Sequence, residues 1–149
     1  MIHARHVPLG DPRIEAMLQE YMREWSALLP MKPGPDGAFA YPHRHRYVDD
    51  DHEAVIFVED ERPVGFALAR RVPGAWQVQE FFVSPAERRR GVGARALTQL
   101  CARHPGPWTL TVRPENPAAL AFWRRVLGPA PTEERGGDGV LRRRFLFQA

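Results

Sequence analysis

The chain has 149 residues and 44% of them are hydrophobic, so it is long enough for one domain with a core of its own. Its 21 basic and 18 acidic residues nearly balance, which argues against a nucleic-acid partner. One cysteine, Cys101, excludes an internal disulfide and a cysteine-rich zinc site, and the chain shows neither a signal-like start nor a long apolar run. These features predict a cytoplasmic protein with no membrane partner.

The N-terminal half is expected to form a strand, a helix and a hairpin. A short strand over residues 2–6 precedes a helix that begins at Asp11-Pro12 and ends before Pro30, because its apolar residues recur at helical spacing. Residues 31–52 hold prolines, glycines and histidines without a sustained period, which predicts a loop or a broken helix. The stretches AVIFVED and VGFALARRV then indicate a β-hairpin.

The C-terminal half alternates between strands and helices. AWQVQEFFV is expected to be a central strand, and a helix follows from about Gly93 to His104. WTLTV is the next strand, NPAALAFWRRVLG is a helix that stops at Gly128, and VLRRRFLF is the last strand. Hairpin-like strands followed by this alternation predict an α/β fold of the α+β type, with a mixed sheet and helices on its faces, in a single domain over 1–149.

The stretch SPAERRRGVGARAL places three arginines directly before a Gly-x-Gly at the start of a helix. Gly91 and Gly93 are expected to let a phosphate approach the backbone, where the unpaired N–H groups of the helix start point outward. A pyrophosphate suits that geometry, and the arginines would add charge-assisted bonds. The alternative is a capped helix start with solvated arginines, since a lone Gly-x-Gly is weak evidence.

A second motif decides between these two interpretations. VSPAERRRGVGARAL has the order Val-x-Pro-x-x-Arg-x-x-Gly-x-Gly, and NPAALAFW follows with the order Asn-x-x-Ala-x-x-Phe-aromatic. Together they resemble the GNAT superfamily of acyl-CoA N-acyltransferases over Gln77 to Gly128, whereas residues 31–52 share no motif with it. The resemblance implies a mostly antiparallel sheet of about six or seven strands with a central strand splayed at the CoA site.

The resemblance also implies the activity and its partners. The chain is expected to be an N-acetyltransferase that moves acetyl from acetyl-CoA, its co-substrate, directly to an amine, without a metal. The amine, on a small molecule or a peptide, is not identified, and a homodimer is left open. Matching the motifs position by position gives the residues expected to contact acetyl-CoA, which are Phe82, Val83, Arg88, Arg89, Gly91, Val92, Gly93, Ala94, Asn116 and Trp123. Asn116 has a second expected role as the N-cap of its helix.

Two positions bear on catalysis. Glu80 is the candidate base, because alternation along its strand places it on the face of Val78 and Phe82 near the strand end. The alternative is a carboxylate paired with an arginine. Trp123 stands where many family members have a tyrosine that protonates the leaving thiolate, and an indole cannot give up a proton usefully. Water is then expected to protonate the thiolate, and packing in the core is the alternative role of Trp123.

The 31–52 stretch and the missing acid leave two further hypotheses open. His43, His45 and the run Asp49 to Asp51 form only a weak metal signal, so a loop that lines the substrate or is merely solvated is the better interpretation. The aspartates, if they lined the site, would favour a cationic amine. The competing function is a CoA-binding module that has lost catalysis and senses acyl-CoA, which Trp123 motivates.

Overall fold

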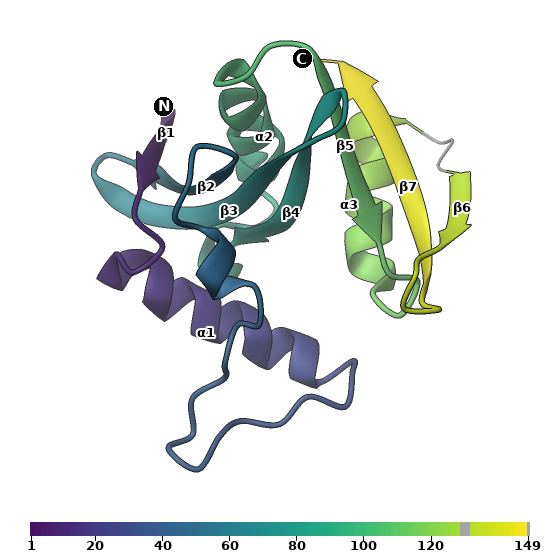
Figure 1. The fold of residues 1–149 in the computed structure, drawn as a ribbon. Helices are drawn as coiled ribbons and strands as arrows, with labels where there is room; N and C mark the ends of the chain where they lie inside the picture. The colour runs from purple at the N-terminus through teal and green to yellow at the C-terminus, as the bar shows by residue number, and fades with distance from the viewer. Residues whose placement is uncertain (129–131, 149) are drawn as a thin grey trace.

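The computed structural model describes residues 1–128 and 132–148 and contains a seven-stranded sheet with the order β1-β2-β3-β4-β5-β7-β6 (Figure 1). β4 and β5 pair in parallel, and all other neighbouring strands pair antiparallel. The prediction of a mixed, mostly antiparallel sheet of six or seven strands with helices on both faces is confirmed. The short strand β6 (Thr132–Arg135) was not predicted.

The N-terminal elements follow the predicted order. They are β1 (Ile2–Val7), α1 (Pro12–Ser26), β2 (His52–Glu59) and β3 (Arg62–Val72). α1 begins where expected, since the Asp11 carboxylate accepts a hydrogen bond from the Arg13 N–H at 2.9 Å and Pro12 takes the first helical position. β2 and β3 form the predicted hairpin, and its turn has positive φ at Asp60 (52°) and Glu61 (61°).

Residues 31–52 are mostly irregular, as predicted, with one short 3-10 helix, η1 (Arg44–Arg46). The segment is tied to α1 by the Gln19 side chain, which donates to the Phe39 carbonyl and accepts from the Phe39 N–H, both at 2.8 Å. Phe39 and Tyr41 are buried against the α1 side of the sheet. Phe39 and Tyr41 therefore anchor the segment to that side of the sheet, whereas residues 32–38 are exposed.

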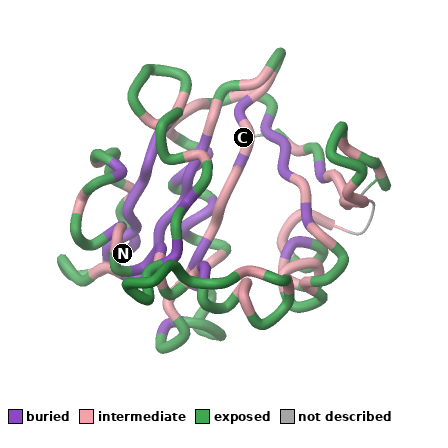
Figure 2. Tube along the Cα trace, turned by 60° about the horizontal axis from the view of Figure 1, so that its bottom comes forward, coloured by how far each residue is buried: buried purple, intermediate pink, exposed green. Residues whose placement is uncertain are grey.

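The C-terminal elements build the other side of the sheet. They are β4 (Ala75–Val83), η2 (Pro85–Glu87), α2 (Val92–Ala102), β5 (Pro107–Val112), α3 (Pro117–Leu127) and β7 (Leu141–Gln148). α2 and α3 share a core with one face of the sheet, and α1 packs on the opposite face (Figure 1). Figure 2 shows that buried residues follow the central strands between these helices.

A β-bulge in β4 changes which face each of its residues occupies. Leu68 of β3 pairs with Glu80 and Ala69 pairs with Val78, so Gln79 is an extra residue without a partner in the ladder. Val78 consequently packs on the α2 side, whereas Phe82 packs on the α1 side. The prediction that Glu80 shares a face with both is correct for Phe82 and wrong for Val78, because simple alternation does not anticipate the extra residue.

β4 and β5 separate part of the way along the sheet. They pair at Trp76–Trp108, Gln77–Thr109 and Val78–Leu110, and β4 then runs on to Val83 beside β3 alone. Figure 1 shows the two strands diverging toward α3. Backbone groups of β4 beyond Val78 thus face a gap on the β5 side, which is the splayed central strand that the resemblance implies. Among the described residues, no helix combines the length and apolar character needed to cross a membrane.

Candidate active site

One cavity, of about 1030 Å³, lies at the end of β4 between α1, α3 and the glycine turn, and we call it the turn-side cavity. Every residue predicted to contact acetyl-CoA lines it: Phe82, Val83, Arg88, Arg89, Gly91, Val92, Gly93, Ala94, Asn116 and Trp123. The structure therefore brings the two motifs together around one space. Their contacts with acetyl-CoA stay a prediction.

The glycine turn presents the start of α2 to the turn-side cavity. Gly91 precedes the helix with φ of 72°, in the left-handed region, and its carbonyl accepts the first helical bond from the Arg95 N–H at 3.2 Å. The N–H groups of Val92, Gly93 and Ala94 have no carbonyl of a preceding helical turn to bind. They also lie at the positive end of the α2 dipole, so the turn fits the pyrophosphate of a CoA ester.

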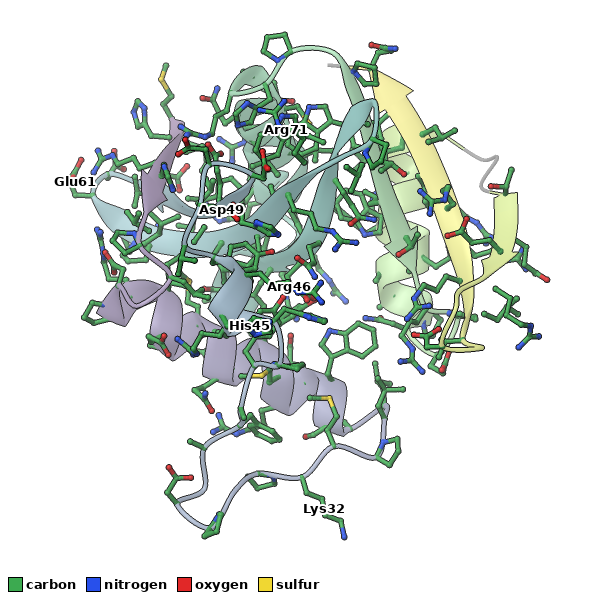
Figure 3. All side chains as sticks on the ribbon, viewed as in Figure 1. Lys32, His45, Arg46, Asp49, Glu61 and Arg71 are labelled. Carbon is green, nitrogen blue, oxygen red and sulfur yellow. The ribbon has the colours of Figure 1, made fainter. Side chains whose placement is uncertain are left out.

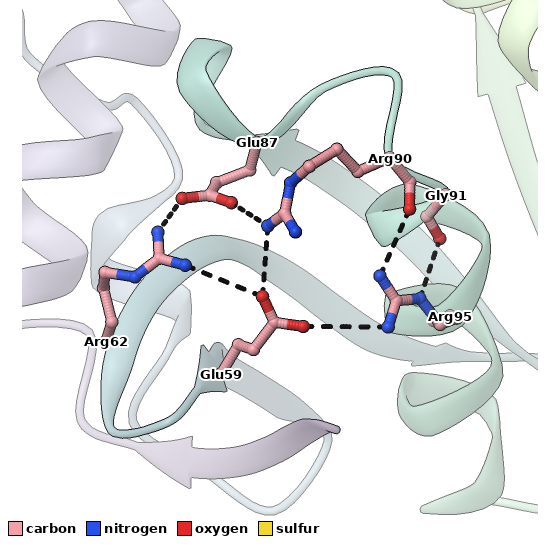
Figure 4. Close-up of polar contacts among 6 residues, drawn as sticks. All are labelled: Glu59, Arg62, Glu87, Arg90, Gly91 and Arg95. Carbon is pink, nitrogen blue, oxygen red and sulfur yellow. Dashed lines mark hydrogen bonds and ion pairs between the residues drawn. The ribbon is translucent and has the colours of Figure 1, made fainter.

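Ion pairs hold this turn in place (Figure 4). Glu87, buried to 6% exposure, pairs with both Arg62 and Arg90. Glu59 pairs with Arg90 at 3.1 Å and with Arg95 at 3.7 Å. The Arg90 guanidinium is therefore engaged in ion pairs that stabilise the turn, and it is not placed to bind an anionic ligand. A buried carboxylate with two guanidinium partners fixes the chain far better than a solvated pair would.

Arg88 also has a structural role. Its Nε donates to the Val83 carbonyl at 2.8 Å, and its guanidinium pairs with Glu24 of α1 at 2.7 Å. The same group lies over the Phe82 ring at 5.5 Å. Arg88 and Arg89 both line the cavity, but the Arg88 guanidinium is engaged in joining α1 to the end of β4, whereas Arg89 has positive φ of 68° and no such ion pair among the described residues. Arg89 is accordingly the better placed of the two for an incoming phosphate.

Gly93 corrects one part of the sequence interpretation. A Cβ at this position would lie 2.7 Å from a ring carbon of Phe122, so the absence of a side chain lets α3 approach α2. A Cβ at Gly91 would meet no atom of the described chain within 4 Å, and its glycine is required by the backbone conformation. The expectation that the missing side chains serve the approach of a phosphate therefore omits the main steric role of Gly93, which is its contact with Phe122.

Asn116 and Trp123 come from α3. The Asn116 side chain accepts a hydrogen bond from the Ala119 N–H at 3.0 Å, which confirms its role as N-cap. Trp123 is 6% exposed and packs edge-on against Phe81 and Phe122, with ring centroids 5.1 and 4.8 Å away. The packing role of Trp123 is thus real, and its remaining surface lines the turn-side cavity.

A second cavity, of about 970 Å³, lies on the side of the 31–52 segment, and we call it the loop-side cavity. It is bounded by α1, by the segment around Tyr41, by β4 and by the hairpin of β6 and β7 across the gap. The two cavities share a boundary formed by Tyr21, Trp25, Phe81, Asn116, Ala119 and Trp123. They therefore meet where β4 leaves β5.

Glu80 lines the loop-side cavity at this junction. The Tyr21 hydroxyl donates to its carboxylate at 2.7 Å and the Tyr41 hydroxyl donates at 2.9 Å. Burial raises the pKa of Glu80, and the two tyrosine hydrogen bonds partly oppose that rise. Burial also raises the pKa of Tyr21 and of Tyr41, so both phenols stay protonated and continue to donate. Among the described residues no arginine pairs with Glu80, so the ion-pair alternative is wrong.

Tyr21 and Tyr41 were not predicted as partners of Glu80, from which they are 59 and 39 residues away along the chain. Tyr21 looked like one more apolar residue of α1, and Tyr41 lies in the segment without a recognised motif. No short-range pattern joins them to Glu80. A buried carboxylate in a strand with no nearby arginine is the one signal that could have indicated a need for hydroxyl donors.

The histidines and aspartates of the 31–52 segment do not form a site of their own. In the part of the chain that the structure describes, no three histidine, cysteine or acidic side chains gather as a metal would require. Asp49 accepts from the His52 ring at 2.8 Å and Asp51 pairs with Arg71 at 3.0 Å, and neither lines the loop-side cavity. The argument from these aspartates for a cationic amine therefore has no structural basis, whereas His43 does line that cavity.

The split sheet, the glycine turn and the paired cavities agree with the class of acyl-CoA-dependent transferases that the resemblance implied. A model of the acetyltransferase (GNAT) family matches residues 14–128, and the chain belongs to that family. The N-alpha-acetyltransferase RimI of Mycobacterium tuberculosis (strain ATCC 25618 / H37Rv) is 38% identical over 104 residues. That match covers 63% of this chain and 60% of the relative.

Solved structures share the fold at low sequence identity. The ribosomal-protein-S18-alanine N-acetyltransferase of Escherichia coli has a TM-score of 0.65 and 16% identity, over 99% of this chain and 94% of that chain. Aminoglycoside acetyltransferase AAC(6')-Ib in complex with coenzyme A and kanamycin has a TM-score of 0.69 and 16% identity, over 99% of this chain and 95% of that chain. These likenesses support the architecture and leave the acceptor of this chain to be inferred from its own residues.

Proposed function

We propose that the protein is an N-acetyltransferase that passes acetyl from acetyl-CoA directly to an amine bound in the loop-side cavity. The observation that carries this proposal is the place of Glu80. It lies at the meeting point of the two cavities, and its carboxylate is held by Tyr21 and Tyr41 with its pKa raised by burial. A base with a raised pKa accepts a proton more readily than an exposed carboxylate does.

Each part of the site has a separate role in the proposed reaction. The turn before α2 holds the pyrophosphate, and the unpaired edge of β4 binds the pantetheine arm as a further strand would. The acceptor amine enters from the loop-side cavity, and its nitrogen attacks the thioester carbonyl. Glu80 takes the proton that this nitrogen loses. The tetrahedral intermediate collapses with loss of the CoA thiolate, whose ordinary pKa, about 8.5 for a thiol, lets water protonate it.

The competing function is a module that binds acyl-CoA without turning it over. Trp123 favours it, because the indole stands where the family's acid is expected and is packed between aromatic rings. Glu80 with its two hydroxyl donors favours the enzyme, since a sensor needs no buried base beside the cofactor site. A cytoplasmic location and a single domain over 1–149 stay part of our proposal, supported by the unpaired Cys101 and by one sheet that includes strands from both halves of the sequence.

Glu80→Gln tests the proposal. Acetyl-CoA and a pool of amines are supplied, and turnover is followed by free thiol and by the mass of the acetylated product. We expect kcat to fall by about 10²-fold or more while the Kd of acetyl-CoA changes little, because a lost base affects the chemical step and not the cofactor grip. Glu20→Gln, at an exposed position of α1 that lines neither cavity, is the matched control.

Two results would contradict the proposal. Acetyl-CoA binding without thiol release in the presence of any amine would favour the sensor. A Glu80→Gln enzyme that keeps both the wild-type rate and the wild-type acidic limb of its pH profile would show that Glu80 is structural.

A further inference from the structure

Arginines dominate the charged lining of the loop-side cavity. They are Arg46, Arg70, Arg113, Arg142 and Arg144, and the acidic residues that line the same cavity are Glu80, Glu134 and Asp138. Charge of one sign in a concave, partly desolvated site attracts ligands of the other sign. The charge of the cavity lining therefore disfavours a polycationic ligand.

The arginines on the β5 and β7 side are neutralised by partners. Arg113 pairs with Glu115 at 2.8 Å and Arg142 pairs with Asp138 at 2.8 Å. Arg144 pairs with Glu134 at 2.6 Å. These three pairs form a wall whose charges are compensated within the protein, so the wall itself has no need of an anionic ligand.

Arg46 and Arg70, on the opposite wall, have no carboxylate partner within salt-bridge distance among residues 1–128 and 132–148. Arg70 is partly buried, and its Nε donates to the neutral Gln77 side chain at 2.6 Å, which orients the guanidinium without cancelling its charge. Figure 3 shows Arg46 beside the opening of the sheet, while Asp49 lies farther away over β2 and β3. Burial first, and then the charges of Arg46 and Arg70, lower the pKa of His43.

The register of β3 and β4 relates this charge to the reacting atoms. Leu68 pairs with Glu80, and Arg70 follows two positions along the same strand, a rise of about 7 Å. The side chains of Glu80 and Arg70 line the loop-side cavity. An acceptor whose nitrogen is next to Glu80 would thus place a group about two residues of extended chain away near Arg70.

We infer that the acceptor amine carries a carboxylate, which Arg70 and Arg46 bind while Glu80 faces the nitrogen. This inference rests on the proposed function. The carboxylate can belong to an acidic side chain near the N-terminus of a peptide, which reaches such a separation, or to a free amino acid, whose carboxylate lies closer to its nitrogen and would be met by the long arginine side chain. A guanidinium fixed by Gln77 recognises either through charge-assisted hydrogen bonds.

The test uses matched acceptors and acetyl-CoA. Peptides with a free N-terminus and Glu or Asp at the second or third residue are compared with the same peptides containing Gln or Asn, and amino acids are compared with their amides. We expect kcat/KM to be about tenfold or more higher for the carboxylate in at least one of the two series, as a charged hydrogen bond would give. A response in the peptide series indicates a peptide acceptor, and a response in the amino-acid series indicates a small-molecule acceptor.

Arg70→Gln and Arg46→Gln are expected to reduce that preference to about twofold or less, mainly through KM. Lys32→Gln is the matched control, because it removes one positive charge from the tip of the same segment, away from the cavity (Figure 3). Binding of the matched acceptors to the protein saturated with free CoA gives a readout that needs no turnover. Carboxylate forms should bind more tightly, and the two arginine variants should abolish the difference.

The outcomes separate this inference from the proposed function. Acetylation of the carboxylate and amide forms at equal rates, or a preference that survives in both arginine variants, overturns the inference. The proposed acetyltransferase function is unaffected by either result. Acceptance of polycationic amines over all others overturns the inference as well. Failure of every amine to release thiol, while acetyl-CoA still binds, overturns the proposed function, and the inference falls with it.

Discussion

At the scale of single residues, the site depends on Glu80 and the two hydroxyl groups bound to it. The carboxylate is buried enough for its pKa to rise, and Tyr21 and Tyr41 limit that rise by donating to the ionised form. Without these donors the pKa of the carboxylate would rise further, and the ionised form that can act as a base would be less favoured. In the proposed mechanism the tyrosines therefore adjust the pKa of the base rather than replace it.

Tyr21→Phe should move the acidic limb of the kcat/KM profile to higher pH. The variant removes a donor to the carboxylate, so the pKa of Glu80 rises further, and Glu80 must lose its proton before it can act. The rate at pH 6 should fall more than the rate at pH 8. Tyr47→Phe is the control, since its hydroxyl binds Gln79 and leaves both bonds to Glu80 in place. Equal profiles for wild type and Tyr21→Phe would show that Glu80 does not set the limb.

Trp123→Phe should cost little turnover. The variant keeps an aromatic ring between Phe81 and Phe122 and removes the N–H and some volume, so we expect a loss of about 1 kcal/mol in unfolding free energy. If water protonates the thiolate, kcat stays within about threefold of wild type. A hundredfold fall in kcat with unchanged acetyl-CoA affinity and unchanged Tm would instead give the indole a part in the chemistry.

At the scale of elements, the turn before α2 is shaped by its neighbours as well as by its own sequence. Glu59 and Glu87 fix its arginines, Gly91 supplies the left-handed backbone, and Gly93 lets Phe122 of α3 approach. The two glycines of one motif thus satisfy different physical needs. One need is conformational and local, and the other is steric and tertiary.

A double-mutant cycle separates these two needs. Gly93→Ala should lower the unfolding free energy by about 1–3 kcal/mol through overpacking against Phe122, and Phe122→Leu should recover part of that loss. Gly91→Ala should lose about 1 kcal/mol through backbone strain, with no recovery from Phe122→Leu. Denaturant unfolding measures all the variants. Additive effects for Gly93→Ala and Phe122→Leu would show that the ring is not what requires the glycine.

At the scale of the whole molecule, the parts that could be predicted are those with local signals. Helical periodicity predicted α1, α2 and α3 to within a few residues, and the two motifs predicted a set of residues that line one cavity. The extra residue Gln79 was not predicted, because the polar residues Gln77, Gln79 and Glu80 of this nine-residue strand do not by themselves show which one lacks a partner in the ladder. The approach of Tyr21 and Tyr41 to Glu80 depends on how α1 and the 31–52 segment pack, which no local pattern encodes.

The same limit applies to the charge of the acceptor site. Asp49 to Asp51 are adjacent in the sequence and suggested an acidic site, whereas Arg46 and Arg70 are far apart in the sequence and line one cavity. Runs of like charge are conspicuous in a sequence but are often solvated or paired. Here Asp51 is occupied by Arg71, and the unpaired charge that matters comes from two different elements.

The three residue pairs that join β4 to β5 make the sheet mechanically a pair of plates, β1 to β4 and β5 to β7, with a narrow hinge between them. A pantetheine arm bound along β4 and a nucleotide end held by α2 and α3 would brace both plates at once. Amide hydrogen exchange in β5, which pairs with β4 through only those three residue pairs, and in the adjacent β7 should therefore slow on acetyl-CoA binding by more than exchange in β2, which pairs along most of its length with both β1 and β3. Uniform slowing across the sheet would mean that the two plates already move as one rigid body. Acetyl-CoA binding would then not reduce any motion of one plate relative to the other.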